Sequence, residues 1–418
     1  MKLIIKKDYF LLLFYLIPIS IVFGPSISLL NIILIDLSFL FFVIKFRLNL
    51  FNNQAFKLIS ILYFYLIFNS LIAINHEITL SRNIGFIRFI IFFVSINYIF
   101  KFFDTKKIFY FWGFIILFFS FDVFLEFFSG SNLLGWGASE INGVPQAHSD
   151  RIVSFFKDEP VAGAFLSGFI LIIFGFLIDN PKISKVVPLI FLLFTSAAIL
   201  LTGERSNSIK IFIAIFFFII LLNSIKAKTK LIIFLTILLI LAFSFNQSNY
   251  IKKRYYNQFL FHFSSLENFK KYLNESNYFI LYKSGINVFK NYPILGVGNK
   301  NYRIETCNNF SDKINQKNYI CQTHPHQIYI ELLSEHGVIG SIILLGILFS
   351  LMFKILQNIR KSKNYIQIGS FLYILISFIP LLPSGSFFSD FNSTIFWINF
   401  SIMFACDKKT NIFYKNEK

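Results

Sequence analysis

The chain has 418 residues, of which 56% are hydrophobic and only 14% are charged. A soluble domain needs roughly 25% charged residues, so this composition excludes a soluble globular protein and indicates an integral membrane protein. The formal net charge of +18 does not require a nucleic-acid partner, because Lys and Arg also accumulate in the cytoplasmic loops of membrane proteins.

Apolar runs long enough to span a membrane follow one another along the chain. At 1.5 Å rise per residue, helices of about 20 residues cross a hydrocarbon core of roughly 30 Å, whereas strands would need an alternating pattern that this sequence lacks. We therefore predict an all-α, polytopic transmembrane helical bundle of about twelve helices. The predicted spans are 8–23, 26–44, 56–75, 84–100, 107–128, 159–178, 186–202, 207–224, 230–246, 337–357, 364–382 and 390–406.

The positions of Lys and Arg predict the orientation of these helices. If the N-terminus is cytoplasmic, most basic residues of the short connections fall on the cytoplasmic side. The short outer loops then hold only Arg82, Arg151, Lys157 and Arg205. Because positively charged loops stay in the cytoplasm, we expect both termini to be cytoplasmic.

Two outer segments are long, and they define the predicted organisation of the chain. Residues 1–246 hold helices 1 to 9, with an outer loop at 129–158. Residues 247–336 form a large outer loop between helices 9 and 10, and 337–418 hold helices 10 to 12 and a cytoplasmic tail. The large loop opens with YIKKRYYNQFLFHF, a basic and aromatic stretch typical of a membrane surface, and a further helix is predicted at 277–290.

The end of the large loop concentrates reactive side chains. Thr323 and Pro325 indicate a helix start, which places His326 in the first helical turn. The positive end of the helix disfavours imidazolium there, and a neutral imidazole can act as a general base. The alternative is a structural histidine that hydrogen-bonds the loop.

Cys307 and Cys321 lie in the same loop. In an oxidising compartment they could form a disulfide, which would close a loop of about 15 residues. The alternative is a metal site that also uses His324 and His326, but the short paired spacing of zinc motifs is absent.

Several outer cations predict an anion site at the membrane surface. Arg205 lies in TGERSN, in a short outer turn, where a guanidinium can hold a phosphate through two hydrogen bonds. The alternative role for Arg205 is an anchor for lipid headgroups. Arg151, Lys157 and Arg303 are further cations that together with it could bind a diphosphate.

The acidic residues have two possible roles. Asp158 and Glu159 precede a helix start and complement its positive end, or they orient the cations or contact an acceptor hydroxyl. Within the spans an unpaired charge is costly, so we expect Arg88 to pair with Asp122 or Glu126.

These motifs together resemble the O-antigen ligase family. HQIYIELLSEHG, in which nine residues separate Gln327 from Gly337, resembles the family's His-(Asn/Ser/Gln)-x9-Gly signature. PILGVGNKNYR is similar to its Pro-x-x-Gly-x-Gly stretch, and TGERSN matches the position of its phosphate-binding arginine. A second arginine, often found just before the glycine stretch, has no counterpart here, where Lys283 and Lys290 stand instead.

The resemblance implies an enzyme of the bacterial inner membrane. Such proteins are glycosyltransferases that take a glycan from an undecaprenyl-diphosphate carrier on the periplasmic face. Ligases pass the glycan to lipid A-core, and the related polymerases pass it to another repeat unit. The implied reaction is an inverting displacement without a metal ion or other cofactor, in which the only partners besides these substrates are membrane lipids.

The resemblance also implies roles for individual residues. Arg205 would stabilise charge on the leaving diphosphate, and His326 would orient or deprotonate the acceptor hydroxyl. The residues expected to contact the substrate are Arg303, Arg151, Lys157, Glu159 and His324.

A secondary transporter and a flippase for the carrier lipid are the rival functions. Both are disfavoured by three features: the longest loop lies outside between helices 9 and 10, the two halves show no repeat, and polar residues gather at the outer face.

Overall fold

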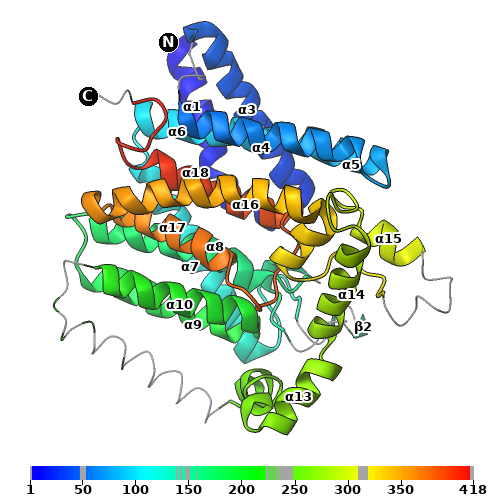
Figure 1. Ribbon diagram of the computed structural model, residues 1–418. Coiled ribbons are helices and arrows are strands. Elements are labelled where there is room, and N and C mark those ends of the chain that lie inside the picture. The colour runs from blue at the N-terminus through cyan, green and yellow to red at the C-terminus, as the bar shows by residue number, and fades with distance from the viewer. Residues whose placement is uncertain are drawn as a thin grey trace. The chain divides into compact units, whose positions relative to one another are not determined.

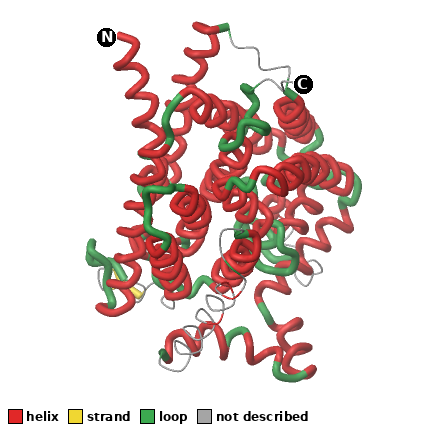
Figure 2. Tube along the Cα trace, turned by 90° about the vertical axis from the view of Figure 1, so that its left-hand side faces the viewer, coloured by secondary structure: helices red, strands yellow, loops and turns green. Residues whose placement is uncertain are grey.

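The structure is a computed structural model that describes residues 2–47, 53–137, 140–141, 144–145, 151–157, 159–222, 226, 228, 230, 235, 248–308 and 319–414. Helices make up almost all of the described chain (Figure 2). One antiparallel hairpin joins two short strands, β1 (Glu140–Ile141) and β2 (Val144–Pro145). The predicted all-helical class is therefore confirmed.

Six stretches of described helix are long and apolar enough to cross a membrane. They are Pro25–Phe46, Gln54–Leu71, His76–Phe102, Lys106–Ser129, Ala162–Asp179 and Ile328–Ser362. Two shorter apolar helices are Val186–Leu201 and Tyr365–Ser377. The count of twelve stays a prediction, because most of the predicted span 230–246 lies outside the described residues.

The chain separates into two compact units, each assembled from three segments. The first unit comprises Met1–Asn31, Phe103–Phe269 and Lys363–Ser377. Its elements besides the hairpin are α1 (Lys2–Tyr15), α2 (Ile17–Val22), α7 (Lys106–Ser129), η1 (Ser154–Phe156), α8 (Ala162–Asp179), α9 (Val186–Leu201), α10 (Arg205–Leu221), α12 (Asn249–Ile251), η2 (Lys252–Asn257), η3 (Leu260–Phe263) and α17 (Tyr365–Ser377).

Helix α8 is the centre of the first unit. It packs against α7, α9, α10 and α17, and nearly all of its side chains are buried. Its backbone approaches α17 closely, because a Cβ atom at Gly175 would lie only 2.3 Å from the carbonyl oxygen of Tyr365. The elements that surround α8 therefore have well-defined positions within this unit.

The second unit comprises Ile32–Phe102, Lys270–Ser362 and Phe378–Lys418. Its elements are α4 (Gln54–Leu71), α5 (His76–Gly85), α6 (Ile87–Phe102), α14 (Asn277–Asn291), α15 (Tyr302–Asn308), α16 (Ile328–Ser362) and α18 (Asp390–Ala405). Two helices have ends in both units, α3 (Pro25–Phe46) and α13 (Leu266–Glu275). The predicted helix at 277–290 is confirmed as α14.

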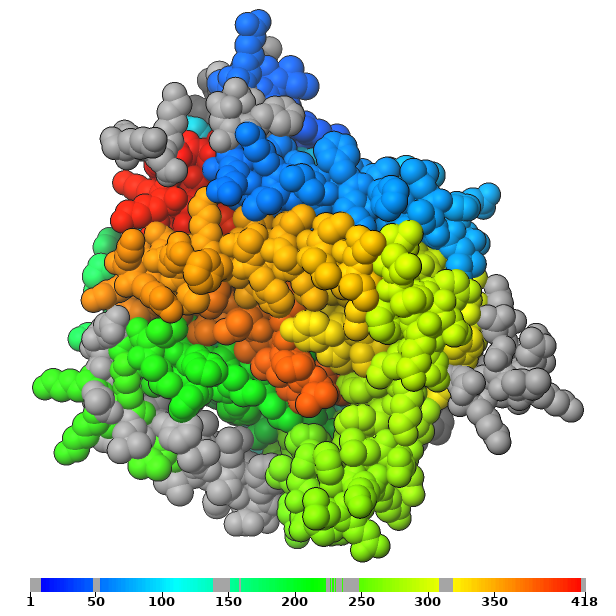
Figure 3. Space-filling model, viewed as in Figure 1, coloured from blue at the N-terminus to red at the C-terminus, as the bar shows by residue number. Residues whose placement is uncertain are grey.

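Aromatic side chains and one long helix hold the second unit together. The rings of Phe89 and Trp397 stack between α6 and α18, with centroids 6.3 Å apart. Helix α16 packs on α4 and α14, and in both Figure 1 and Figure 3 it runs along the blue α4. Helix α16 begins at Ile328 and is kinked at Gly337, the residue at which the predicted span 337–357 begins.

Candidate functional site

His326 lies just before α16. The side-chain oxygen of Gln327 caps this helix by accepting a hydrogen bond from the Ile330 N–H at 2.9 Å. The prediction that His326 occupies the first helical turn is therefore wrong: with Gln327 as the cap, the helix begins at Ile328, three residues later than a helix that begins at Pro325. His326 instead has a φ of +56°, and its carbonyl oxygen accepts a hydrogen bond from the Ser384 N–H at 2.9 Å.

Two rings face the His326 imidazole. The centroid of the His324 ring lies 4.0 Å away, and that of Tyr278, on α14, lies 6.0 Å away. Burial and then the positive charge of Lys300 lower the pKa of His324 to about 4, although a Ser384 backbone contact opposes them. His324 therefore presents a neutral ring to His326 at neutral pH.

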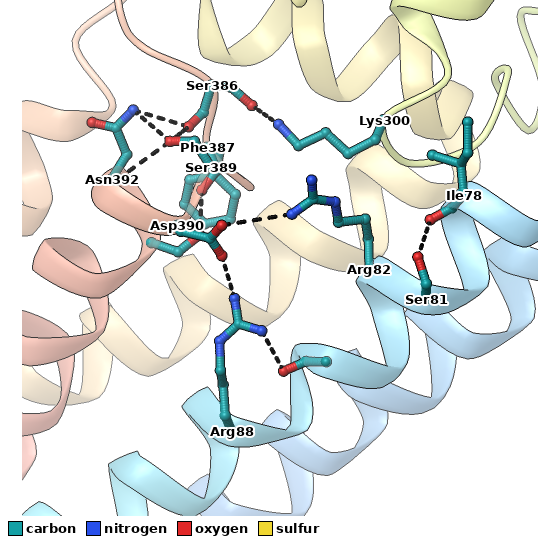
Figure 4. Close-up of polar contacts among 12 residues, drawn as sticks. Ile78, Ser81, Arg82, Arg88, Lys300, Ser386, Phe387, Ser389, Asp390 and Asn392 are labelled. Carbon is teal, nitrogen blue, oxygen red and sulfur yellow. Dashed lines mark hydrogen bonds and ion pairs between the residues drawn. The ribbon is translucent and has the colours of Figure 1, made fainter. Parts of the chain in front are cut away.

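A buried polar network lies beside the two histidines. Glu331, fully buried on the first turn of α16, accepts hydrogen bonds from the Ser386 hydroxyl at 2.5 Å and the Phe387 N–H at 2.9 Å. The Lys300 ammonium donates to the Ser386 hydroxyl from the other side (Figure 4). These residues are far apart in the sequence, and the sequence analysis had identified none of them.

A second charged group of this unit surrounds Asp390 at the start of α18. Its carboxylate receives Arg88 at 2.5 Å and Arg82 at 3.6 Å (Figure 4). The prediction that Arg88 pairs with Asp122 or Glu126 is therefore wrong, because Asp390 compensates its charge. Arg82 lies in α5 rather than in a loop, and its side chain stays 56% exposed.

The sulfur atoms of Cys307 and Cys321 are joined in the structure. They are consequently not available as thiolate ligands for a metal in this state, which removes the alternative metal site made with His324 and His326. The bridge ties the end of α15 to the segment that leads to His324. Arg303, also on α15, has an exposed side chain.

In the first unit, two arginines meet at the turn before α10. Arg205 is the first residue of α10, and its Nη1 donates to the carbonyl oxygen of Gln258 at 2.6 Å. Arg254 is buried, and its Nη2 and Nε donate to the Gly203 carbonyl at 2.7 and 3.2 Å. Its Nη1 also donates to the Gln258 side chain at 2.8 Å.

Sequence reasoning had missed Arg254. The basic and aromatic stretch that contains it had been interpreted only as a membrane-surface element. The two guanidinium groups share Gln258, so the structure fixes both of them in place.

The loop before α8 lies against the same turn. The Ile152 N–H donates to the Thr202 carbonyl at 3.2 Å, which places the loop segment that begins at Arg151 beside the turn. At the far end of this segment Lys157 is exposed, with a φ of +60°. Glu159 is also exposed, and Asp158 lies outside the described residues.

The carboxylate that caps α8 comes from Glu204. Its oxygens accept hydrogen bonds from the N–H groups of Gly163 and Ala164 at 2.5 and 3.2 Å, and from the Asn207 side chain at 2.6 Å. Burial raises the pKa of Glu204 to about 7, whereas these donors and the charge of Arg151 favour the ionised form. Glu204 thus joins the turn, the α8 N-terminus and Arg151 into one charged cluster.

The structure therefore brings together two sets of predicted and unpredicted residues. In one unit, Arg151 and Arg205 form a cluster with Glu204 and Arg254. In the other, His324 and His326 lie beside Lys300 and Glu331. Long apolar helices define a helical membrane protein, and these polar clusters are its candidate functional sites.

A comparison with protein-family models matches part of the chain. Residues 189–345 match the model of the O-antigen ligase family. The match runs from α9 into α16 and includes Arg205, Arg254, Lys300, His326 and Glu331. This stretch of the chain is therefore similar to the family that the sequence motifs resemble. No curated protein matches the chain.

Proposed function

We propose that this protein transfers a glycan from an undecaprenyl-diphosphate carrier to an acceptor hydroxyl on the periplasmic face of the bacterial inner membrane. The observation that carries the proposal is the family match at 189–345, because both His326 and Arg205 lie within it. The acceptor that we propose is lipid A-core, as in an O-antigen ligase. The same features also fit a polymerase that extends the carrier-linked glycan.

The proposed reaction is an inverting displacement. The acceptor oxygen attacks the anomeric carbon, the bond to the carrier diphosphate breaks, and His326 takes the hydroxyl proton. Arg205 stabilises the charge that develops on the diphosphate. It is supported in this role by Arg254, which shares its Gln258 anchor. Because arginines provide this positive charge, we propose that the reaction needs no metal ion.

The other cations contribute to binding in this proposal. Arg151 lies beside the turn that carries Arg205, and Lys157 and Arg303 are exposed and free of the steric cover that would block a phosphate. Glu159 is likewise exposed, where it can contact a sugar hydroxyl. His324, neutral beside His326, offers a hydrogen bond to the acceptor.

Replacing His326 with Ala tests the proposal. The variant should still insert into the membrane. Its rate of transfer of carrier-linked glycan to lipid A-core should fall by at least ~100-fold, the usual scale for a lost general base. The matched control is His262→Ala, which alters another histidine of the large loop and should leave the rate unchanged. Full activity of the His326→Ala protein would remove His326 from the mechanism.

A further inference from the structure

We propose that Glu331 is a positioning residue for His326: it anchors the loop that fixes the His326 backbone, and its charge stabilises the imidazolium. This inference rests on the proposed function, in which His326 accepts a proton. Its premise is the geometry around the start of α16.

The backbone of His326 is in an unfavourable conformation. A φ of +56° costs a residue other than glycine of order 1 kcal/mol or more, so the surroundings must enforce it. The Ser384 N–H, which donates to the His326 carbonyl at 2.9 Å, is one such constraint. The conformation of His326 therefore depends on where the loop of Ser384 lies.

Glu331 determines where that loop lies. Its two carboxylate oxygens hold the Ser386 hydroxyl at 2.5 Å and the Phe387 N–H at 2.9 Å, only two and three residues beyond Ser384. Hydrogen bonds to a buried carboxylate are roughly twice as strong as neutral ones. A continuous chain of contacts thus runs from Glu331 through the loop to the His326 backbone.

The Glu331 carboxylate also acts on the imidazole by its charge. It is close enough to His326 for the two charges to interact. The rings of neutral His324 and of Tyr278 on α14 also face the imidazole. Glu331 is thus an acidic group that would stabilise the imidazolium formed when His326 takes the acceptor proton.

Lys300 makes this arrangement possible. Glu331 and Glu335 are both fully buried and lie one helical turn apart, where like charges repel. The ammonium of Lys300 attracts both carboxylates and donates to Ser386. Without a cation at this place, burying an ionised Glu331 would be too costly.

A titration of His326 tests the inference without any substrate. In protein labelled at the histidine Cε1 carbon, the His326 signal is assigned as the one that disappears in His326→Gln. Glu331→Gln should lower its titration midpoint by about one pH unit or more, because the imidazolium loses a nearby opposite charge. Glu331→Asp retains the charge and should shift the midpoint by less than half as much.

The matched control is Glu305→Gln. Glu305 is another buried carboxylate of the same unit, and it accepts hydrogen bonds from Tyr292 and Tyr319. The Glu305→Gln substitution should leave the titration midpoint of His326 unchanged. An equal His326 midpoint in the wild type and in Glu331→Gln would overturn the proposal.

Transfer kinetics supply the second readout. With carrier-linked glycan as donor, Glu331→Gln should lower kcat about tenfold or more while KM stays within about threefold, because the residue acts through the base. The acid limb of the pH–rate profile should move to lower pH. If His326→Ala is fully active, the proposed function fails. If His326→Ala is inactive but Glu331→Gln matches the wild type, only the present inference fails.

Discussion

Arg205 and Arg254 are held by the same residue, and this shared anchor determines what each can do. Both donate to Gln258, Arg205 to its backbone and Arg254 to its side chain. Arg254 also closes the turn by two hydrogen bonds to the Gly203 carbonyl. Donors that are fixed before a charge develops need no rearrangement when it does, which is what stabilisation of a leaving diphosphate requires.

Arg205→Lys tests whether the planar guanidinium matters. A lysine keeps the charge but cannot bond both Gln258 and a phosphate in the same fork geometry. We expect kcat/KM for glycan transfer to fall about ten- to a hundredfold, less than the roughly hundred- to thousandfold cost of a lost oxyanion donor, because the charge remains. Arg360→Lys, on the exposed last turn of α16, is the control and should change nothing. An unchanged rate for Arg205→Lys would favour a lipid anchor.

His324 predicts how stability depends on pH. Its pKa is lowered from 6.5 to about 4 in the folded protein. Between these two pH values His324 is protonated in the unfolded chain but neutral in the folded one. Stability should therefore fall as the pH drops from about 6.5 to about 4, by up to ~3 kcal/mol. Above pH 6.5 the group makes no difference, because it is neutral in both states.

Thermal unfolding of the detergent-solubilised protein between pH 7.5 and 4.5 checks this effect. His324→Asn cannot take up the proton, so its unfolding midpoint should fall less steeply than that of the wild type over this range. Parallel curves for the two proteins would show that His324 does not carry the acid sensitivity.

Residues that stand in a short sequence motif could be predicted as candidate site residues, whereas residues outside such motifs could not. His326 and Arg205 stand in short motifs, and their surroundings in the chain are enough to select them as candidates. Glu331 and Lys300 both bond Ser386, which lies 55 and 86 residues away from them in the sequence. Such a connection depends on tertiary structure, and a single sequence carries no signal for it.

At the scale of elements, the two glycine motifs form one structure. Helix α16 breaks at Gly337, where φ is +63°, and the turn that follows α14 docks onto the break. The Val338 N–H donates to the Pro293 carbonyl at 2.9 Å, and the Val297 N–H donates to the Ser334 carbonyl at 3.0 Å. The Pro-x-x-Gly-x-Gly turn thus supplies the hydrogen bonds that the break leaves open in α16.

Gly337→Ala should destabilise the protein. A Cβ atom there would lie 2.3 Å from the Ile294 carbonyl oxygen, in a backbone region that is almost exclusive to glycine. We expect a loss of at least ~2 kcal/mol, seen as a drop of about 2 °C or more in Tm.

Gly346→Ala is the matched control for this prediction. Gly346 lies in the same helix, and no atom lies within 4 Å of a Cβ added there. The Gly346→Ala protein should keep the wild-type Tm or raise it slightly, because alanine favours helix. Equal Tm values for the two variants would show that the docked turn does not constrain Gly337.

The apolar runs predicted where helices lie but not where they break. Helices α3, α4, α7, α8 and α9 coincide closely with predicted spans, because about twenty apolar residues can satisfy their backbone in lipid only as a helix. The breaks at Leu16, Phe86 and Gly337 lie within apolar or mixed stretches, and the local composition does not mark them. At Gly337, the break is specified by the turn that docks on it.

At the scale of the molecule, the two units are interleaved along the chain. Helix α17 packs on α8 although nearly two hundred residues separate them in sequence, and α18 packs on α6 across a longer separation. Neither unit is therefore made of one continuous piece of the chain. Tests of function need the full chain, and the relevant setting is the native cell.

Deleting the chain in its native cell distinguishes the candidate functions through the lipopolysaccharide ladder. A ligase alone forms the bond to lipid A-core, so its loss should remove all long glycan from the core while carrier-linked polymer accumulates. A polymerase forms bonds between repeat units, so its loss should leave a core that bears a single repeat. A flippase forms no bond, and its loss should keep the carrier-linked glycan on the cytoplasmic side.

We expect the ligase pattern. Complementation with the full wild-type chain should restore the ladder, whereas complementation with His326→Ala should reproduce the deletion, because the transfer step needs the base. The protein level in the membrane must match between the two strains for this comparison to hold. If His326→Ala restored the ladder, the deletion phenotype would come from another property of the chain, and neither ligase nor polymerase chemistry could be assigned to this histidine.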